Sequence, residues 1–220
     1  MNKSSKAFVG MDVHKESIDW AIAERDGEVR AFGRTGGDLN AVARTVRKLV
    51  ACGKTLVFVY EAGPCGFGIH RWLKSRGHEC WVVSPSLTPK KPGERIKTDT
   101  RDAIKLARLA RAGELTAIYV PEAADEALRD LVRAREDAVA MQRQARHRLQ
   151  ALLLRNDIRY VGKTAWTPAH QRWIARLKLP YAPQQIAFEE YVQAVQEATT
   201  RIDRLTTAIQ AAVSTWRWQP

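Results

Sequence analysis

Residues 55–60 constrain the fold of this chain more than any other segment. They read Thr-Leu-Val-Phe-Val-Tyr, six residues that favour β-structure, with no alternation of polar and apolar side chains. Such a strand is typical of a sheet that is buried on both faces and covered by helices on both sides. Glu61 follows directly, and a buried carboxylate at that position needs a partner. The segment therefore predicts an α/β domain whose central strand ends in an acid.

The residues on either side of this strand predict an RNase H-like order of elements over residues 1–120. Asp26-Gly27 is a hairpin turn signal, which joins two of three short strands into an antiparallel meander. Asp38 caps the helix that follows. In chain order we expect strands at 7–11, 17–24 and 29–33, a helix at 39–50, the central strand, a helix through 69–73, a strand at 80–83 and a helix that opens at 99.

Residues 121–220 form a second region, because strand signals end there and helical periodicity remains. One helix is expected over 122–156, although Arg135 and Gln142 interrupt its apolar seam. The following helix repeats apolar residues every seven positions in two series, Phe188, Val195, Ile202 and Ile209, and Tyr191, Ala198, Leu205 and Ala212. The pattern predicts an all-α coiled-coil region. This region either joins two copies in a homodimer or higher homo-oligomer, or pairs its own helices in a hairpin.

The net charge of the chain favours a polyanionic partner. Its 36 Lys and Arg outnumber its 24 Asp and Glu, which gives +12 at pH 7. Cations that neutralise phosphates release condensed counterions, so this excess favours nucleic acid. A membrane partner is not expected, because no segment approaches the roughly 18 apolar residues of a spanning helix and no signal stretch is visible. Three scattered cysteines indicate free thiols in a reducing cytoplasm.

Four acids stand where an RNase H-like sheet would gather them. Asp12 follows the first strand and Glu61 the fourth, and these strands are neighbours in such a sheet. Ligands of open α/β sheets collect at the carboxyl ends of the strands. Asp99 and Asp102 are three residues apart, which places both carboxylates on one face of a helix. We therefore expect four carboxylates to converge on one point.

Converging carboxylates repel one another unless cations lie between them. Two Mg²⁺ ions about 3.5–4 Å apart meet this need in phosphodiester cleavage, where one activates the attacking oxygen and the other stabilises the leaving oxygen. Taken singly, each acid has another explanation. Asp99 could cap its helix, Asp102 could complement the helix dipole, and Asp12 could form a turn.

Three short blocks resemble the signature motifs of the DEDD transposases of bacterial insertion sequences, to which Piv-type DNA invertases are related. The blocks are VGMDVHK at 9–15, YEAGPCG at 60–66 and KTDTRDA at 97–103. They occur in the family's order over residues 6–120, and the helical region after them resembles the family's coiled-coil segment. The resemblance implies a RuvC-like, Mg²⁺-dependent site that also accepts Mn²⁺, formed by Asp12, Glu61, Asp99 and Asp102.

The resemblance also implies site-specific recombination of DNA, guided by a structured RNA that the element encodes, in the bacterial cytoplasm at the nucleoid. Members of the family continue into a second domain that supplies a serine nucleophile. That carboxy-terminal domain would begin where this chain stops, at Pro220, and Ser214 on the heptad helix matches no such motif. We therefore expect the chain alone not to complete strand exchange.

Basic residues cluster near the acidic helix and in the later part of the first long helix. Cations beside a metal site hold a phosphate backbone in line and neutralise it. The alternative is a merely solvated face. Tryptophans near these residues could stack on bases, although core packing is the better interpretation. The candidate nucleic-acid-binding residues are His14, Lys15, Lys90, Lys91, Arg95, Lys97, Arg101, Lys105, Arg143, Arg146 and Arg148.

Two other functions compete with a recombinase. An actin-like or sugar-kinase ATPase also begins with Gly-x-Asp on a first strand, but His14 and Lys15 stand where small phosphate-binding residues are needed. The stronger alternative is a non-catalytic fragment that binds nucleic acid and dimerises. Metal-dependent cleavage of DNA distinguishes this alternative from the recombinase.

Overall fold

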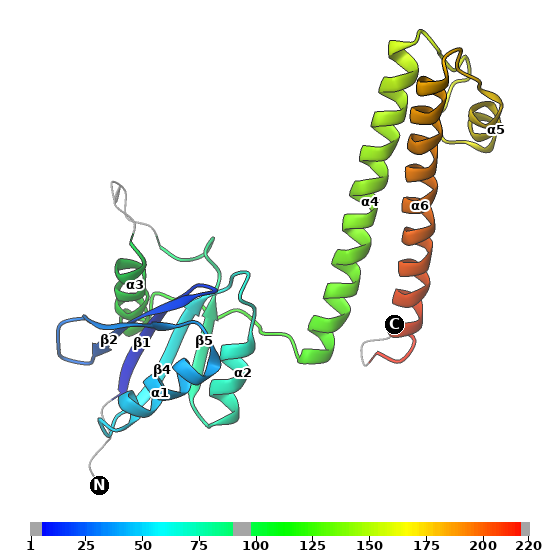
Figure 1. Cartoon of the computed structure of the whole chain (residues 1–220). Helices are drawn as coiled ribbons and strands as arrows, with labels where there is room; N and C mark the ends of the chain where they lie inside the picture. The colour runs from blue at the N-terminus through cyan, green and yellow to red at the C-terminus, as the bar shows by residue number, and fades with distance from the viewer. Residues whose placement is uncertain (1–5, 90–97, 217–220) are drawn as a thin grey trace. The chain divides into compact units, whose positions relative to one another are not determined.

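The computed structural model describes residues 6–89 and 98–216. The chain divides into two compact units, Met1–Val120 and Pro121–Pro220, which are considered separately here. Figure 1 shows the first unit as a sheet with helices and the second as long helices.

The first unit is built on one five-stranded mixed sheet with the strand order β3-β2-β1-β4-β5. Strands β1, β2 and β3 form an antiparallel meander, and β4 runs parallel to both β1 and β5. The expected α/β fold and the neighbouring positions of the first and fourth strands are therefore confirmed. The strands are β1 (Lys6–Val13), β2 (Ser17–Glu24), β3 (Arg30–Gly36), β4 (Thr55–Glu61) and β5 (Glu79–Val83).

Three helices cover the two faces of this sheet (Figure 1). Helices α1 (Leu39–Val50) and α2 (Gly68–Ser75) pack on one face, with Met11, Phe58 and Tyr60 in the shared core. Helix α3 (Asp99–Ala112) covers the other face against alternate residues of β4 and β2. Because helices cover both faces, the central strands are apolar along nearly their whole length.

Helix α3 lies unusually close to β1 at Gly10. A Cβ atom added at Gly10 would lie 2.1 Å from the carbonyl oxygen of Ala103 and 2.6 Å from the backbone nitrogen of Ala107. Glycine is therefore required here for space. Asp12 lies two residues beyond Gly10, so this contact also brings the end of β1 close to the start of α3.

Two strands differ from their expected bounds by more than one residue. The third strand was expected at 29–33 but spans Arg30–Gly36, because its pairing with β2 continues until Gly36 stands opposite Ser17. It also carries an extra residue at Phe32, where the register with β2 shifts. Gly33, at this bulge, has a φ of 132°, a conformation that favours glycine. The first strand was expected to end at residue 11 but continues to Val13, which places Asp12 within β1.

The second unit is a helical hairpin, which we call the arm. Helix α4 (Ala123–Arg155) and helix α6 (Ala182–Val213) pack along each other. The heptad residues Phe188, Val195 and Ala198 are buried in this arrangement. The seam is therefore used within the chain, which is the hairpin alternative that the sequence left open.

Polar side chains cross the α4–α6 seam where the apolar pattern is interrupted. Gln142 donates a hydrogen bond to Thr199 Oγ1 at 2.8 Å, and Arg135 Nε donates to Thr206 Oγ1 at 2.8 Å. These bonds explain how two polar residues fit on the seam of the first helix. Glycine and prolines interrupt the helical pattern of the sequence at 162–168 and 180–183. Between these two breaks the structure contains a short helix that was not predicted, α5 (Pro168–Arg176).

Among the described residues, no helix combines the length and apolar character needed to cross a membrane. The three cysteines are free, with Cys80 buried and Cys52 and Cys65 exposed. Burial raises the pKa of the Cys80 thiol to about 12, so this group remains protonated at neutral pH.

Candidate metal centre

Asp12 and Glu61 come from neighbouring parallel strands of the sheet. The β1/β4 register ends with Met11 opposite Tyr60, so the next residues along, Asp12 and Glu61, stand beside each other. Side chains alternate along a strand. Asp12 shares its face with Gly10, and Glu61 shares its face with Val59, and both of these residues pack against α3. The two acids therefore lie on the α3 side of the sheet, at the carboxyl ends of β1 and β4.

The N-terminus of α3 supplies the other two acids. Thr98 caps the helix, and its hydroxyl accepts a hydrogen bond from the backbone N–H of Arg101 at 3.3 Å. Asp99 and Asp102 lie in the first turn. The cap is therefore Thr98 rather than Asp99, so the Asp99 carboxylate is not used for capping.

Three groups are close enough to share one cation. Ligand atoms of Asp12, His14 and Asp99 all lie within 4.8 Å of one another. The His14 Nε2 atom is 3.0 Å from Asp12 Oδ2 and 3.7 Å from Asp99 Oδ1. His14, expected to contact phosphate, thus lies among the acids. Glu61 and Asp102 do not belong to this close group.

The environment of Asp12 disfavours its charged form. Burial raises the pKa of the Asp12 carboxyl above its ordinary value, and the negative charges of Asp102 and Asp99 raise it further. The hydrogen bond and charge of His14 act in the opposite direction without reversing the shift. The charges of both helix acids therefore act on Asp12, while the convergence of all four carboxylates stays a prediction.

This arrangement fits a hard divalent cation. Carboxylate oxygens are the preferred protein ligands of Mg²⁺. Asp12 and Asp99 supply them at short range. A bound cation would offset the burial that raises the pKa of Asp12 and would relieve the smaller repulsion from Asp102 and Asp99. The imidazole of His14 is a further possible ligand, one that sequence reasoning assigned to nucleic acid instead.

Three residues of this region escaped sequence reasoning. Asp19 on β2 is 3% exposed and stands opposite Asp12 in the β1/β2 register. It accepts hydrogen bonds from Arg34 Nε at 2.7 Å and from Thr100 Oγ1 at 2.6 Å. One signal could have found Asp19: it is an acid in phase with Ala21 and Ala23, on a strand that otherwise reads as buried.

The basic residues expected near the acids have different surroundings. Lys15 is exposed and pairs with Glu16 at 3.2 Å. Arg101 is exposed and Lys105 half-buried on α3. Four others, Lys90, Lys91, Arg95 and Lys97, lie outside the described residues. Contact of any of these residues with nucleic acid stays a prediction.

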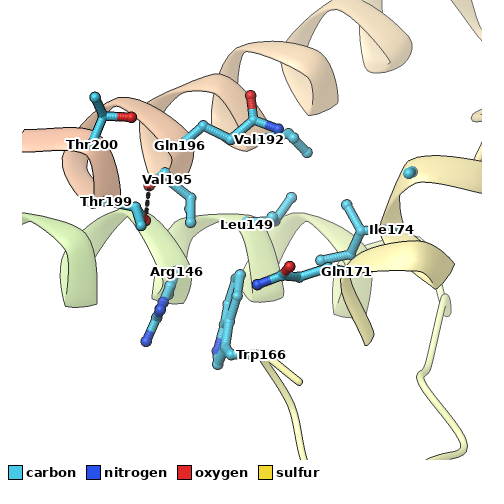
Figure 2. Close-up of a pocket in the computed structure, with 11 residues that line it drawn as sticks. Arg146, Leu149, Trp166, Gln171, Ile174, Val192, Val195, Gln196, Thr199 and Thr200 are labelled. Atoms are coloured by element: carbon cyan, nitrogen blue, oxygen red, sulfur yellow. Dashed lines mark hydrogen bonds between the residues drawn. The ribbon is translucent and has the colours of Figure 1, made fainter. Parts of the chain in front are cut away.

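The other basic cluster lies on α4 of the arm. Arg143 and Arg148 are exposed, and Arg146 is half-buried. The Arg146 guanidinium carbon lies 4.7 Å from the ring centre of Trp166. Figure 2 shows both side chains at a cavity of about 410 Å³ between α4, α5 and α6. Trp166 also packs against the apolar core of the arm, as does Trp173, which agrees with the packing interpretation of the tryptophans.

The family model of the IS110-type DEDD transposases, described as "Transposase", matches residues 9–156. The chain belongs to this transposase family. This match covers all three motif blocks and the whole of α4. The resemblance inferred from the acids and their spacing is therefore confirmed at the level of the family.

Two curated relatives carry transposase names. The y4qE protein of Sinorhizobium fredii is 46% identical over 192 residues, which are 86% of this chain and 49% of the relative. The transposase for insertion sequence element IS1533 of Leptospira borgpetersenii is 33% identical over 208 residues, 93% of this chain and 60% of the relative. The chain thus spans about half to three fifths of the length of these relatives.

Solved structures give only distant similarity. The catalytic core domain of BIV integrase has a TM-score of 0.27 at 19% identity, over 49% of this chain and 82% of the integrase chain. The Thermoplasma acidophilum Pelota protein has a TM-score of 0.29 at 11% identity, over 64% of this chain and 48% of that one. At these scores neither likeness carries an argument.

Proposed function

We propose that this chain is the catalytic amino-terminal portion of a DNA transposase, with an RNase H-like, RuvC-like unit that performs Mg²⁺-dependent phosphodiester chemistry. The observation that carries the proposal is the grouping of Asp12, His14 and Asp99 ligand atoms within 4.8 Å at the ends of β1 and α3. Membership of the transposase family supports DNA as the substrate.

The acids would hold divalent metal ions through Asp12 and Asp99, with Glu61 and Asp102 beside them. When bound, the ions supply charge that activates the attacking oxygen and stabilises the leaving oxygen of the phosphodiester. The protein's own contribution is to fix the four carboxylates on rigid strand ends and a capped helix. His14, in contact with both Asp12 and Asp99, would hold them in place between catalytic cycles.

The partners follow from the same proposal. Exposed cations on α3 and α4 would contact DNA and a structured guide RNA, in the bacterial cytoplasm at the nucleoid.

Two copies would associate through the half-buried part of the α6 seam, around Ile202 and Leu205. Light scattering tests the association, because Ile202→Asp should halve the mass. An unchanged mass would remove the dimer from the proposal.

Metal-dependent cleavage of branched or supercoiled DNA tests the chemistry. The full chain should nick DNA with Mg²⁺ or Mn²⁺ and not with EDTA, and Asp12→Ala or Glu61→Ala should abolish nicking. Glu114→Ala is a matched control, since Glu114 is an exposed acid just beyond the opposite end of α3. Nicking that survives in both site variants would refute the assignment.

A second candidate function is favoured by the large positive charge of the chain. In that case the chain is a non-catalytic, nucleic-acid-binding and dimerising part of a longer protein. Gel-shift titrations separate the two candidates. Equal binding of RNA or DNA with and without Mg²⁺, together with no cleavage under any condition, would favour the binding role.

A further inference from the structure

Both oxygens of the buried Asp19 carboxylate are hydrogen-bonded. Oδ1 accepts from Thr100 Oγ1 on α3, and Oδ2 accepts from Arg34 Nε on β3. The Asp19 side chain is 4% exposed, whereas the Arg34 side chain is 55% exposed. A buried charge with both oxygens satisfied is a firm anchor, because breaking either bond would leave one buried carboxylate oxygen unsatisfied.

Arg34 connects this anchor to one of the motif acids. While its Nε donates to Asp19, its Nη2 donates to Asp99 Oδ2 at 2.7 Å. The other oxygen of Asp99, Oδ1, lies on the side of His14, 3.7 Å from Nε2. One oxygen of Asp99 is thus held by the guanidinium, while the other is directed toward the group that contains Asp12.

The geometry of arginine suits this connection. Its guanidinium is planar, with donors in a fixed fork, so two carboxylates bonded to it take fixed positions relative to each other. Contact with Asp19 raises the pKa of Arg34 further, so the guanidinium stays charged. A lysine at this position would keep the charge, but its ammonium is a point charge on a flexible stem and lacks the fork.

The helix that carries Asp99 is also fixed to β2 at both ends. At its start, Thr100 bonds to Asp19, and at its end, Arg111 donates to the backbone oxygen of Glu24 at 3.0 Å. The position of Asp99 therefore depends on the helix contacts, while the orientation of its carboxylate depends on Arg34.

We propose that Arg34, held by Asp19, is a positioning residue that orients Asp99 for metal binding. The inference rests on the proposed metal-dependent function and extends it to two residues outside the motif blocks. Hydrogen bonds to ligating carboxylates fix ligand orientation, and their loss typically weakens metal affinity about 10- to 100-fold. Arg34 is not a catalytic residue in this proposal, since it acts through Asp99.

Titration of the full chain with Mn²⁺, monitored by the EPR signal of the free ion, tests this proposal directly. Arg34→Lys and Arg34→Gln should each weaken Mn²⁺ binding by about 10-fold or more. Arg30→Lys is the matched control, because Arg30 lies on the same strand in an exposed ion pair with Glu24. Its Mn²⁺ affinity should equal that of the wild type.

A second pair of variants tests the anchor. Thr100→Val removes the hydroxyl that bonds to Asp19 and should weaken Mn²⁺ binding, whereas Thr100→Ser keeps the hydroxyl and should restore it. Thermal unfolding of every variant is measured alongside. A merely structural role would lower the unfolding temperature and leave the Mn²⁺ affinity of the folded chain unchanged.

The possible outcomes separate this inference from the function beneath it. Unchanged Mn²⁺ affinity in Arg34→Lys and Arg34→Gln would overturn the positioning role while leaving the metal centre in place. Tighter binding in Arg34→Gln would also overturn it, since Arg34 would then compete with the metal. A wild-type chain that binds no Mn²⁺ would refute the metal centre itself, and with it the role of Arg34.

Discussion

The α/β unit and the arm place their polar residues in opposite ways. In the α/β unit the central strands are covered on both faces, and the close group of Asp12, His14 and Asp99 lies where β1 ends and α3 begins. In the arm, Gln142 and Arg135 lie midway along the seam and bond across it to α6. A sheet buried on both faces leaves room for charged side chains mainly at the ends of its strands. The charged residues of a site are therefore brought together there. A two-helix seam stays half-exposed and accepts polar residues along its length.

The largest effect should come from disturbing the contact between β1 and α3. Gly10→Ala places a Cβ against the backbone of Ala103 and Ala107, which cannot move aside as a flexible side chain would. We expect a loss of at least about 4 kcal/mol in the free energy of unfolding, among the most severe effects of single substitutions. Urea denaturation followed by circular dichroism measures it.

Gly68→Ala is the control for this variant, since a Cβ there meets nothing within 4 Å. If Gly10→Ala were as stable as this control, the backbone contact would not set the position of α3. The contrast between a tightly packed sheet unit and a more tolerant arm would then be lost.

A somewhat smaller effect is expected in the core of the arm. Leu149 is 1% exposed and packs in the apolar cluster of α4, α5 and α6. Leu149→Ala should cost about 3 kcal/mol through lost burial and the cavity left behind. Leu154→Ala, at a position 56% exposed, should cost little. Equal losses in the two variants would show that the arm has no specific core.

The side-chain hydrogen bonds across the α4–α6 seam should contribute less to the free energy of unfolding. Gln142→Leu removes the donor to Thr199, and we expect a loss of about 1 kcal/mol or less. The double variant Gln142→Leu with Thr199→Val should recover most of it, because replacing both partners by apolar groups leaves no hydroxyl acceptor unsatisfied at the seam. Chemical denaturation of the two variants measures both free energies of unfolding, and a double variant no more stable than the single one would contradict this account.

The smallest effect concerns the charge of Asp12. Its pKa is raised in the folded chain, so ionisation disfavours folding as the pH rises from the ordinary value of 3.8 through the folded value. Without divalent ions, Asp12→Asn should therefore be slightly more stable than the wild type at pH 7, and the difference should disappear in acid. Mg²⁺ should raise the unfolding temperature of the wild type only.

Asp38→Ala provides a comparison of opposite sign. Backbone hydrogen bonds at the start of α1 lower the pKa of Asp38, so its stabilising effect is present at neutral pH and is lost as the pH falls. Thermal unfolding against pH measures both variants. An Asp12→Asn chain that is less stable than the wild type at pH 7 would contradict the electrostatic account of the metal centre.

Sequence reasoning reached the sheet and the motif acids because both depend on local patterns. The apolar run before Glu61 predicts a buried strand, and the spacing of Asp99 and Asp102 predicts a shared helix face. The helix α5 was missed, since prolines and glycines on either side read as loop. The seam of α6 predicted packing but not the partner, because an apolar stripe does not distinguish α4 of the same chain from a second copy.

The contacts of Asp19 could not be derived in this way. Arg34 lies 65 residues before Asp99, and their contact depends on the meander and on α3 lying across it. The repeat pattern of a sequence does not show which separate elements contact each other in the fold. The roles of Asp12, Glu61, Asp99 and Asp102 in chemistry remain predictions for the cleavage experiment to test.

Strand β3 is an edge of the sheet, and this has a consequence for solubility. Its outer backbone groups could template pairing with another strand, a common route to aggregation. The bulge at Phe32 and the charged side chains of Arg30 and Arg34 interrupt that edge. Replacing Arg34 by an apolar residue would therefore invite self-association of the chain as well as release Asp99.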